Sequence, residues 1–470
     1  MQKQKSNRVS SRNDGLPSWV WPVALVALVV IFLWRCFTTD QLLMSNDGSL
    51  ATLTRAKAIL PDGFLSGWLP GNWLGSVIAY PATPTWFLLY LMPVESFARL
   101  IYVFHALAVS LLTFYWLRRM DLCDFAAFFG SLVMTFAGSY LTYILPGHIG
   151  KFEMTTFAIL SLLCLTRALQ TAHWLDFAWG GVALGLALAG AIDSGALMAL
   201  LIAAWFLFSA GRRWLEVDDH TRRNWVLGFM LLMALSAACA LPIVSSFLRA
   251  GLVTNVPGGA DGDTSEQNWQ WATQWSYPPA EVVDLFAPGY HGWKSQDSQS
   301  PYWGALGRNP QFDPFATPAD LLKAARVTDA AQASQLLQFW SFRFNGDFHG
   351  TVTFLAVLMA ITALFARETQ APDSEARPDW RDAWLRRHGA AIIFWTVVAV
   401  VVLLISFGRY FPPPFRMLHS LPPFNSMRNP NKLLVILTPA LAVLAAIGMD
   451  RLWRESEPPQ AERGSRNAKR

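Results

Sequence analysis

Long apolar segments alternate with short polar ones along most of the chain. At roughly 20 residues, most of the apolar segments are long enough to cross a membrane as an α-helix. The segment 83–94 is shorter, so we expect it to lie along, or re-enter, the membrane surface. The pattern predicts an all-α polytopic membrane protein with about ten transmembrane helices. They are expected at residues 19–37, 97–117, 123–145, 152–169, 174–192, 196–210, 225–248, 351–366, 390–407 and 433–452.

Basic residues give these spans an orientation. Arginine pairs at 118–119, 212–213, 222–223 and 386–387 all fall on the same side of the succession of spans. Lys and Arg are enriched in the cytoplasmic loops of membrane proteins. A basic head also precedes the first span, and no small-residue cleavage site follows it, which indicates an anchor rather than a removed signal. We expect a multi-pass protein of the bacterial cytoplasmic (inner) membrane with both termini in the cytoplasm.

The longest polar stretch divides the spans into two modules. A cytoplasmic basic N-terminus (1–18) precedes an N-terminal transmembrane module of about seven spans (19–248), whose first outer loop is 38–96. A large extracytoplasmic, aromatic-rich loop region (249–348) lies between spans seven and eight. A C-terminal transmembrane module of about three spans (349–453) and a disordered cytoplasmic tail (454–470) complete the chain.

Composition agrees with a membrane protein and excludes several function classes. Hydrophobic residues make up 53% of the chain and charged residues 15%, and the mean hydropathy is +0.30. A soluble domain has roughly a quarter of its residues charged. The four cysteines form no CxxC or Cys/His cluster, which argues against a zinc site or a disulfide framework. Phosphate-binding glycine motifs are also absent from the sequence, which argues against a nucleotide-driven pump, and nothing in it indicates nucleic-acid binding.

The first outer loop carries two acids, Asp40 and Asp47. Asp47 stands in the turn-like run Ser45-Asn46-Asp47-Gly48, before the helix-compatible segment 49–60. A carboxylate held at the membrane surface could act as a base toward the head-group layer. The competing interpretation is a helix N-cap, a position that Asp and Asn favour.

Two more groups of polar residues fall outside. His148, Lys151 and Glu153 follow a short turn, and a set so dense exceeds what the turn itself requires. The alternative for Lys151 is snorkelling at the membrane interface. Arg409, Arg428 and Lys432 lie in the last outer loop, where cytoplasmic retention does not explain them. Such cations suit a phosphate, although anionic lipid head groups would also attract them.

The large loop contributes aromatic side chains, among them Trp293, Tyr302 and Trp303. Aromatic rings suit the apolar faces of sugars, with a polar handle at the ring edge. An aromatic belt at the membrane interface is the competing explanation. His105 lies within the second span, where a packed polar residue is the more ordinary explanation than a ligand.

Three stretches give the sequence a family resemblance. They are residues 138–160 (GSYLTYILPGHIGKFEMTTFAIL), 277–293 (YPPAEVVDLFAPGYHGW) with 300–304 (SPYWG), and 407–434 (FGRYFPPPFRMLHSLPPFNSMRNPNKLL). With Asp47 after the first span, they resemble the YfhO-type bacterial membrane proteins of the GT-C glycosyltransferase superfamily. Many such proteins carry a further C-terminal portion that this sequence lacks. The acidic motif is also a single Asp47 after Asn46, so a divalent metal is not indicated.

The resemblance implies a GT-C-like, inverting transfer of sugar from a polyprenyl-phosphate donor to an envelope glycan, lipid or protein acceptor. Asp47 would be the general base. Arg428 and Lys432 would hold the donor phosphate, with His148 and Lys151 completing the pocket. The residues leave two alternatives open: a transporter or flippase for a lipid-linked glycan, and a non-catalytic envelope assembly protein. Against transport, few spans carry deep polar residues and no inverted repeat is evident.

Overall fold

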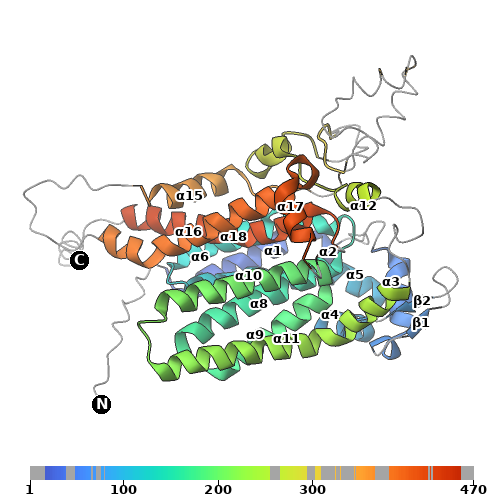
Figure 1. Ribbon diagram of the computed structural model, residues 1–470, viewed down its shortest axis with the longest axis horizontal. Coiled ribbons are helices and arrows are strands. Elements are labelled where there is room, and N and C mark those ends of the chain that lie inside the picture. Colours follow the sequence, from blue (N-terminus) through green and yellow to red (C-terminus); the bar gives the residue numbers. More distant parts are fainter. Residues whose placement is uncertain are drawn as a thin grey trace, which may run out of the picture.

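The computed structural model describes most of the chain as a bundle of long helices (Figure 1). The described residues are 16–38, 48–64, 67–69, 76–78, 80–253, 265–293, 302–307, 323, 326, 329, 343, 346–365, 380–421, 424 and 427–456.

Six helices of the described part are long and apolar enough to cross a membrane, and a bent pair makes up to seven. Three further apolar helices are shorter, so the α-helical, multi-span character is confirmed while ten full-length spans are not. The six are α5 (Val94–Arg119), α8 (Ile149–Thr171), α10 (Ile192–Arg213), α11 (Asp219–Val253), α16 (Trp380–Ser406), and η6 (Pro430–Leu433) continued by α18 (Leu434–Ser456). The bent pair is α6 (Asp124–Phe136) with α7 (Gly138–Leu141) and η2 (Thr142–Ile144), and the shorter helices are α1 (Val20–Phe32), α9 (Trp174–Gly190) and α15 (Thr351–Thr362).

Short elements gather at one end of the bundle, on the right in Figure 1. They include a two-stranded antiparallel hairpin in which Trp68 pairs with Val77. With eight residues, α4 is too short to cross a membrane, in agreement with its expected place at the surface. The short elements are α2 (Arg35–Thr38), α3 (Leu50–Ala58), η1 (Asp62–Phe64), β1 (Gly67–Leu69), β2 (Ser76–Ile78), α4 (Pro84–Leu91), α12 (Ser265–Ala272), η3 (Pro279–Leu285), η4 (Gly408–Tyr410) and α17 (Pro412–His419).

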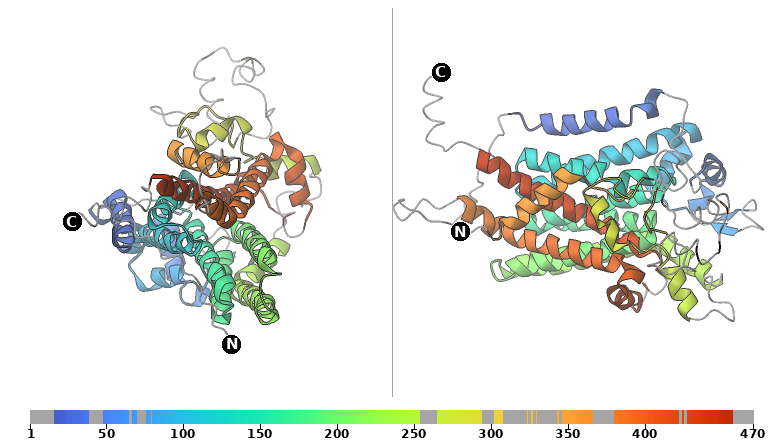
Figure 2. Two further views of the ribbon diagram at one scale, coloured as in Figure 1. Left: turned by 90° about the vertical axis from the view of Figure 1, so that its left-hand side faces the viewer. Right: turned by 90° about the horizontal axis from the view of Figure 1, so that it is seen from above.

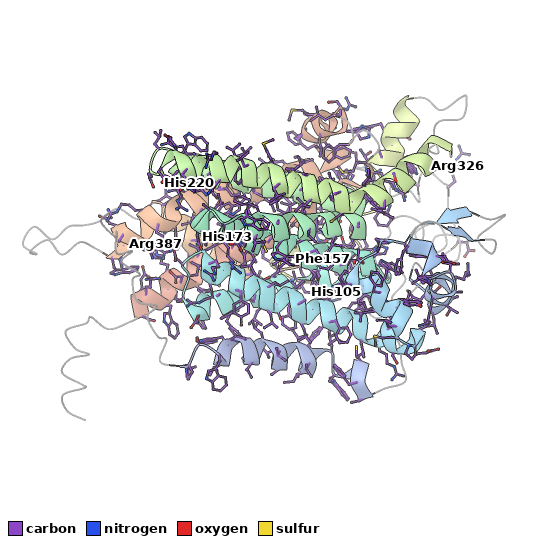
Figure 3. The ribbon with its side chains drawn as sticks, turned by 90° about the horizontal axis from the view of Figure 1, so that it is seen from below. His105, Phe157, His173, His220, Arg326 and Arg387 are labelled. Carbon is purple, nitrogen blue, oxygen red and sulfur yellow. The ribbon has the colours of Figure 1, made fainter. Side chains whose placement is uncertain are left out.

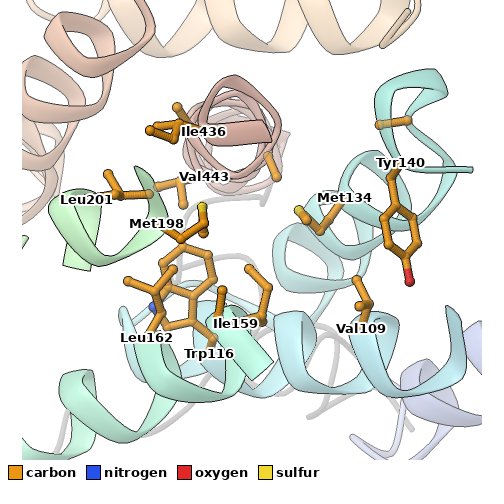
Figure 4. Packing of buried hydrophobic residues seen from close by; sticks show 14 of the residues in the cluster. Val109, Trp116, Met134, Tyr140, Ile159, Leu162, Met198, Leu201, Ile436 and Val443 are labelled. Carbon is orange, nitrogen blue, oxygen red and sulfur yellow. The ribbon is translucent and has the colours of Figure 1, made fainter. Parts of the chain in front are cut away.

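The last helix, α18, lies in the middle of the bundle. It packs against α6, α10, α15 and α16, and most of its side chains are buried. Figure 4 shows how its apolar side chains meet those of α5, α6, α8 and α10. Gly448 touches the carbonyl of Ala356 on α15 so closely that a Cβ would overlap it. Small residues of this kind let membrane helices approach closely. The two expected modules therefore share one core, and α1 lies at its side against α5 and α6 (Figure 2).

The bent span breaks at Ala137, where the two helical parts meet at 45°. The amide of Gly138 donates to the carbonyl of Phe348 at 2.7 Å instead of to its own helix. Thr142 Oγ1 accepts the amide of Gly346 at 3.0 Å. The carbonyl of Phe348, at the end of the large loop region, thus accepts a backbone amide freed by the break, a condition for irregular backbone at membrane depth.

The arginine pairs at 118–119, 212–213, 222–223 and 386–387 lie at the opposite end of the bundle from the short elements (Figure 3). Arg213 donates to the carbonyl of Leu169, and Gln170 donates to the carbonyl of Arg119, so the ends of three spans meet. Asp450 accepts the Cys123 amide and the Trp384 indole there. Figure 3 shows His220 and Arg387 toward this end and Arg326 at the other. The arrangement agrees with the predicted grouping of arginine pairs on one side.

Candidate functional site

Two lysines from distant parts of the chain meet one carboxylate near the short elements. The Lys151 ammonium lies 3.4 Å from Asp193 Oδ1 and donates to Ser194 Oγ. Lys432 forms an ion pair with the other oxygen, Asp193 Oδ2. The side chains of Lys151, Asp193 and Lys432 remain 15%, 34% and 21% exposed. We call Lys151, Asp193, Ser194 and Lys432 the lysine–aspartate cluster. Because three of its side chains are partly exposed, a ligand can reach it from outside.

Each residue of the cluster belongs to the beginning of a helix. Lys151 lies in the first turn of α8, Asp193 and Ser194 in the first turn of α10, and Lys432 in η6 just before α18. The Ser194 amide donates to Asp193 Oδ1 at 2.6 Å and fixes the carboxylate there. The first turns of helices have a partial positive charge from the helix dipole. Together with two ammonium groups, they form an environment that attracts anions.

The first outer loop is attached beside this cluster. The Gly48 amide donates to the carbonyl of Pro146 at 3.1 Å. Gly48 and Gly147 pack so closely that a Cβ on either would overlap the backbone of the other. Gly48 follows Asp47 in the sequence, whereas Asp40 and Asp47 themselves lie outside the described residues. The helix α3 therefore starts against the turn that leads into α8.

The N-cap of α3 is Ser49. Its hydroxyl accepts the amide of Thr52 at 3.3 Å, and its backbone is extended as capping requires. The capping position that served as the alternative explanation for Asp47 is therefore occupied by another residue, two positions further along the chain.

Tyr143 lies between the cluster and the large loop region. It is within electrostatic range of both Asp193 and Asp347, and its ring centroid is 5.8 Å from that of His148. His148 precedes α8 and is half-buried. Two of the predicted site residues, His148 and Lys151, are thus brought to the same end of α8 as Lys432.

A buried charged centre organises the large loop region. Arg343 Nη1 lies 2.7 Å from Asp284 Oδ2 and 3.7 Å from Glu281 Oε2. Glu281 also accepts the Tyr302 hydroxyl at 2.6 Å and the Ala305 amide at 2.6 Å. Burial alone would lower the pKa of Arg343, but the surrounding acidic groups raise it above its ordinary value. The centre thus brings Glu281 and Asp284 together with Tyr302 and Arg343.

Asp347 is the third acid near Arg343. Its side chain is 2% exposed, and Oδ2 has no hydrogen-bond partner among the described residues. Burial raises its pKa to about 6; Arg343 opposes this rise, whereas Glu281 and Asp284 add to it. Three acids thus face one arginine, so Asp347 holds its proton more firmly than an ordinary aspartate.

A small polar group ties the bent span to α18. Ser139 Oγ lies 2.6 Å from Thr438 Oγ1, and His349 Nε2 lies 3.2 Å from the same hydroxyl. Burial lowers the pKa of His349 to about 4, so its ring is neutral at physiological pH. Neutral hydrogen-bonding groups of this kind fix the position of the chain after Asp347.

The cations of the last loop rest on aromatic rings. Arg428 lies over the ring of Trp271, with 4.8 Å from its guanidinium carbon to the ring centroid, and is exposed. Arg409 lies 5.5 Å from the ring centroid of Tyr410. The amides of Asn429 and Asn431 donate to the carbonyls of Ala272 and Trp275. The last loop is therefore bound to α12 and the residues after it, and Arg428 is separated from Lys432 by these anchoring contacts.

The predicted aromatic residues divide into an exposed and a buried set. Trp293 and Trp303 are 45% and 61% exposed, and the Trp303 amide donates to the carbonyl of His291 at 2.9 Å. Tyr302 is buried, and its hydroxyl is bound to Glu281. Exposed rings remain available to a ligand, whereas Tyr302 supports the charged centre.

Glu153 lies inside the bundle rather than in the turn. Its side chain is fully buried, and Thr83, Thr85 and Trp86 are its polar neighbours. His105 lies close to these residues, because its Nε2 is 3.1 Å from the hydroxyl oxygen of Thr85. Its second nitrogen lies 2.8 Å from Thr156 Oγ1. The ring of His105 is therefore satisfied as a packed polar residue.

The described residues contain no group of three or more His, Cys, Asp or Glu side chains that could hold a metal ion. Comparison with known proteins adds no identity, because neither a family model nor a curated protein matches the chain.

Sequence reasoning named Lys151 and Lys432 but not the residues that organise them. Asp193 precedes an apolar segment directly, and an acid in that position is a recognisable helix-start signal. Arg343 and Asp347 fall in the large loop region, where no periodic pattern indicates which charges become buried. Tyr143 gave no signal at all.

Proposed function

We propose that this protein is a membrane glycosyltransferase that moves a sugar from a polyprenyl-phosphate donor to a cell-envelope acceptor. The reaction would take place at the end of the bundle that carries the short elements, which we assign to the outer face. The observation that carries the proposal is the lysine–aspartate cluster: two ammonium groups and three helix starts at an accessible position beside the first outer loop. A lipid phosphate at the membrane surface fits this chemistry.

The transfer would be a direct displacement at the anomeric carbon. An acceptor hydroxyl oxygen forms the new bond to that carbon while the bond from the carbon to the phosphate oxygen breaks. The leaving phosphate keeps the electron pair, and Lys151 and Lys432 stabilise the negative charge that develops on it. Asp47 accepts the proton of the attacking hydroxyl. Gly48 supports this role, because it binds the turn that leads to Lys151.

The remaining polar residues have supporting roles in this proposal. Trp293 and Trp303 offer exposed rings to the sugar or the acceptor. Arg428, held on Trp271, offers a second cation for the phosphate or its lipid neighbours. The centre around Arg343 holds η3 in place through Glu281 and Asp284.

One observation favours a second candidate function, transport of a lipid-linked glycan. Glu153 is a carboxyl group fully buried inside a span, and intramembrane acids are common in transport pathways. The cluster would then hold the phosphate of the cargo. The enzyme remains the better-supported function, because the lysine–aspartate cluster lies at an end of the bundle and not deep inside a span.

The experiment is sugar transfer by purified protein in detergent micelles, from a panel of short-chain polyprenyl-phosphate sugars. A flippase has no work to do in a micelle, which has no two leaflets. We expect turnover, and Lys432→Gln should reduce it roughly tenfold to a hundredfold, since a charge-assisted hydrogen bond contributes about 1.5–3 kcal/mol. Arg416→Gln is the matched control, because Arg416 stacks on Trp269 outside the cluster and should keep activity.

Glu153→Gln separates the two candidates. It should leave micellar turnover within about twofold, because Glu153 is remote from the reacting atoms in the enzyme proposal. Absence of turnover with every donor and acceptor, together with glycolipid translocation in sealed vesicles that Glu153→Gln abolishes, would replace the transferase with a transporter.

A further inference from the structure

The lysine–aspartate cluster contains an acid at the very point where an anion is expected to bind. Asp193 contacts both ammonium groups, one through each carboxylate oxygen. The cations that act on its charge are these two lysines. An anion site built for the greatest positive charge would omit this carboxylate, so its presence requires an explanation.

The charges of the cluster nearly cancel. Two ammonium groups and one carboxylate leave a single unit of positive charge. The site is half-buried at the end of apolar helices, where an unbalanced charge is far more costly than in water. A singly charged ligand would neutralise the cluster, whereas a doubly charged ligand would leave an excess negative charge.

The cluster also keeps hydrogen-bond donors for such a ligand. Each lysine ammonium has three N–H donors. Lys151 directs donors to Asp193 and Ser194, and Lys432 directs one to Asp193, so both retain donors that no described residue occupies. Asp193 also keeps the two ammonium groups close together. Without this carboxylate, their like charges would repel each other and move them apart.

We propose that Asp193 sets the ligand class of this site, selecting lipids with a singly charged phosphodiester over lipids with a diphosphate. The inference rests on the proposed function and refines its donor: a sugar joined to a prenyl chain through one phosphate has a single negative charge, whereas a prenyl diphosphate has at least two. Asp193 is thus a specificity-determining residue that subtracts one positive charge and does not react itself.

The test compares binding of two probes to the purified protein in non-ionic detergent at neutral pH. One is a short-chain prenyl methyl phosphodiester, and the other is the same prenyl chain with a diphosphate. The wild-type protein should bind the phosphodiester more tightly. Asp193→Asn should move the affinity ratio toward the diphosphate by about tenfold or more, since one carboxylate no longer repels the second charge.

Asp193→Glu should keep the wild-type ratio because it keeps the charge. Asp219→Asn is the control, since Asp219 pairs with Arg222 at the far end of the bundle and should change neither affinity. Thermal unfolding of each variant establishes that it is folded. Equal or tighter binding of the diphosphate by the wild type, binding of neither probe, or an unchanged ratio in Asp193→Asn would overturn the inference.

Two sources could supply a singly charged lipid phosphodiester: the sugar donor and bulk phospholipid. If short-chain phosphatidylglycerol displaces the prenyl probe at equal concentration, the charge rule holds and the site belongs to bulk lipid. If it does not compete, the charge rule holds for the prenyl donor. Sugar transfer is measured separately. Turnover without a charge preference would refute this inference but leave the proposed transferase function intact. A charge preference without turnover would refute the transferase function alone.

Discussion

At the scale of single residues, Asp193 and Asp347 show how differently one side-chain type can be used. Asp193 is partly exposed and lies between two lysines. Asp347 is buried beside two other acids that compete for one arginine. The first is held ionised by its contacts, and the second keeps a proton to an unusually high pH. Neither environment can be read from the residues adjacent in sequence.

The raised pKa of Asp347 predicts how stability changes with pH. The pKa of about 6 in the folded protein exceeds the ordinary value of 3.8, so the folded state binds this proton more tightly than the unfolded state. The resulting stability is present below about pH 4 and is lost as the pH rises through about 6. Asp347→Asn mimics the protonated acid and should raise the free energy of unfolding at neutral pH by about 3 kcal/mol.

Thermal unfolding in detergent between about pH 4 and 8 measures this effect. The Asn variant should lose most of the fall in stability that the wild type shows in this range. Asp284→Asn is the comparison, because it breaks the short contact with Arg343 and should destabilise the protein at every pH. A wild-type profile that Asp347→Asn leaves unchanged would show that Asp347 titrates normally.

Asp47→Asn tests the proposed base. The substitution keeps the shape of the side chain but removes its ability to accept a proton. We expect normal membrane insertion and a loss of sugar transfer by about a hundredfold or more, the usual contribution of a general base. Asp40→Asn should be milder. Full activity of Asp47→Asn would exclude the base role, and capping would not explain the residue either, since Ser49 caps α3.

The sequence identified the cations of the site better than its acids. Lys151 and Lys432 stood out as candidates because each is a cation at the outer end of an apolar span. Their common partner was not, because Asp193 is separated from Lys432 by more than half of the chain. Pairings at that separation depend on how helices pack, which the periodicity of one segment does not specify.

At the scale of elements, helix existence was easier to predict than helix length. The span expected over 123–145 is present, but it bends at Ala137. In the sequence around Ala137, only Gly138 indicates a break. The helices α1, α9 and α15 are shorter than the apolar segments that contain them. Apolar runs mark what is removed from water, whereas helix ends depend on caps and on packing.

The bend predicts a stability effect at Thr142. Its hydroxyl accepts the Gly346 amide at 3.0 Å, and Gly346 is buried. Thr142→Val keeps the shape but leaves that amide without a partner, so we expect a loss of about 1–3 kcal/mol in the free energy of unfolding. Thr54→Val is the matched control, because Thr54 bonds its own helix at an exposed position. If the two substitutions lower the free energy of unfolding equally, the bend does not depend on its contacts with residues 346–348.

At the scale of the whole molecule, the bundle has two chemically different ends. One carries the arginine pairs, and the other carries the short elements, the lysine–aspartate cluster and the charged centre of the large loop region. The grouping of arginine pairs followed from the sequence alone. The burial of Arg343, Glu281 and Asp284 did not, because it requires Arg343 to meet η3 about 60 residues earlier in the chain.

The orientation of the bundle predicts the labelling of single cysteines. In a background without the four native cysteines, cysteines at Ser45 and Ser298 should react with an impermeant thiol reagent in intact spheroplasts. A cysteine at Ser374 should react only after lysis, because it is expected on the cytoplasmic side. Labelling of Ser374→Cys in intact cells, or silence at both outer positions, would reverse the orientation and remove the proposed outer-face site.

The central claim is that a lipid phosphate binds at the lysine–aspartate cluster. A structure of the protein in lipid nanodiscs, with a phosphonate analogue of a polyprenyl-phosphate sugar, tests this most directly. The account predicts that the phosphonate group lies within hydrogen-bonding distance of both Lys151 Nζ and Lys432 Nζ, with the sugar toward the loop that contains Asp47. A phosphonate bound instead at Arg428 and Trp271, or on the far end of the bundle among the arginine pairs, would contradict it.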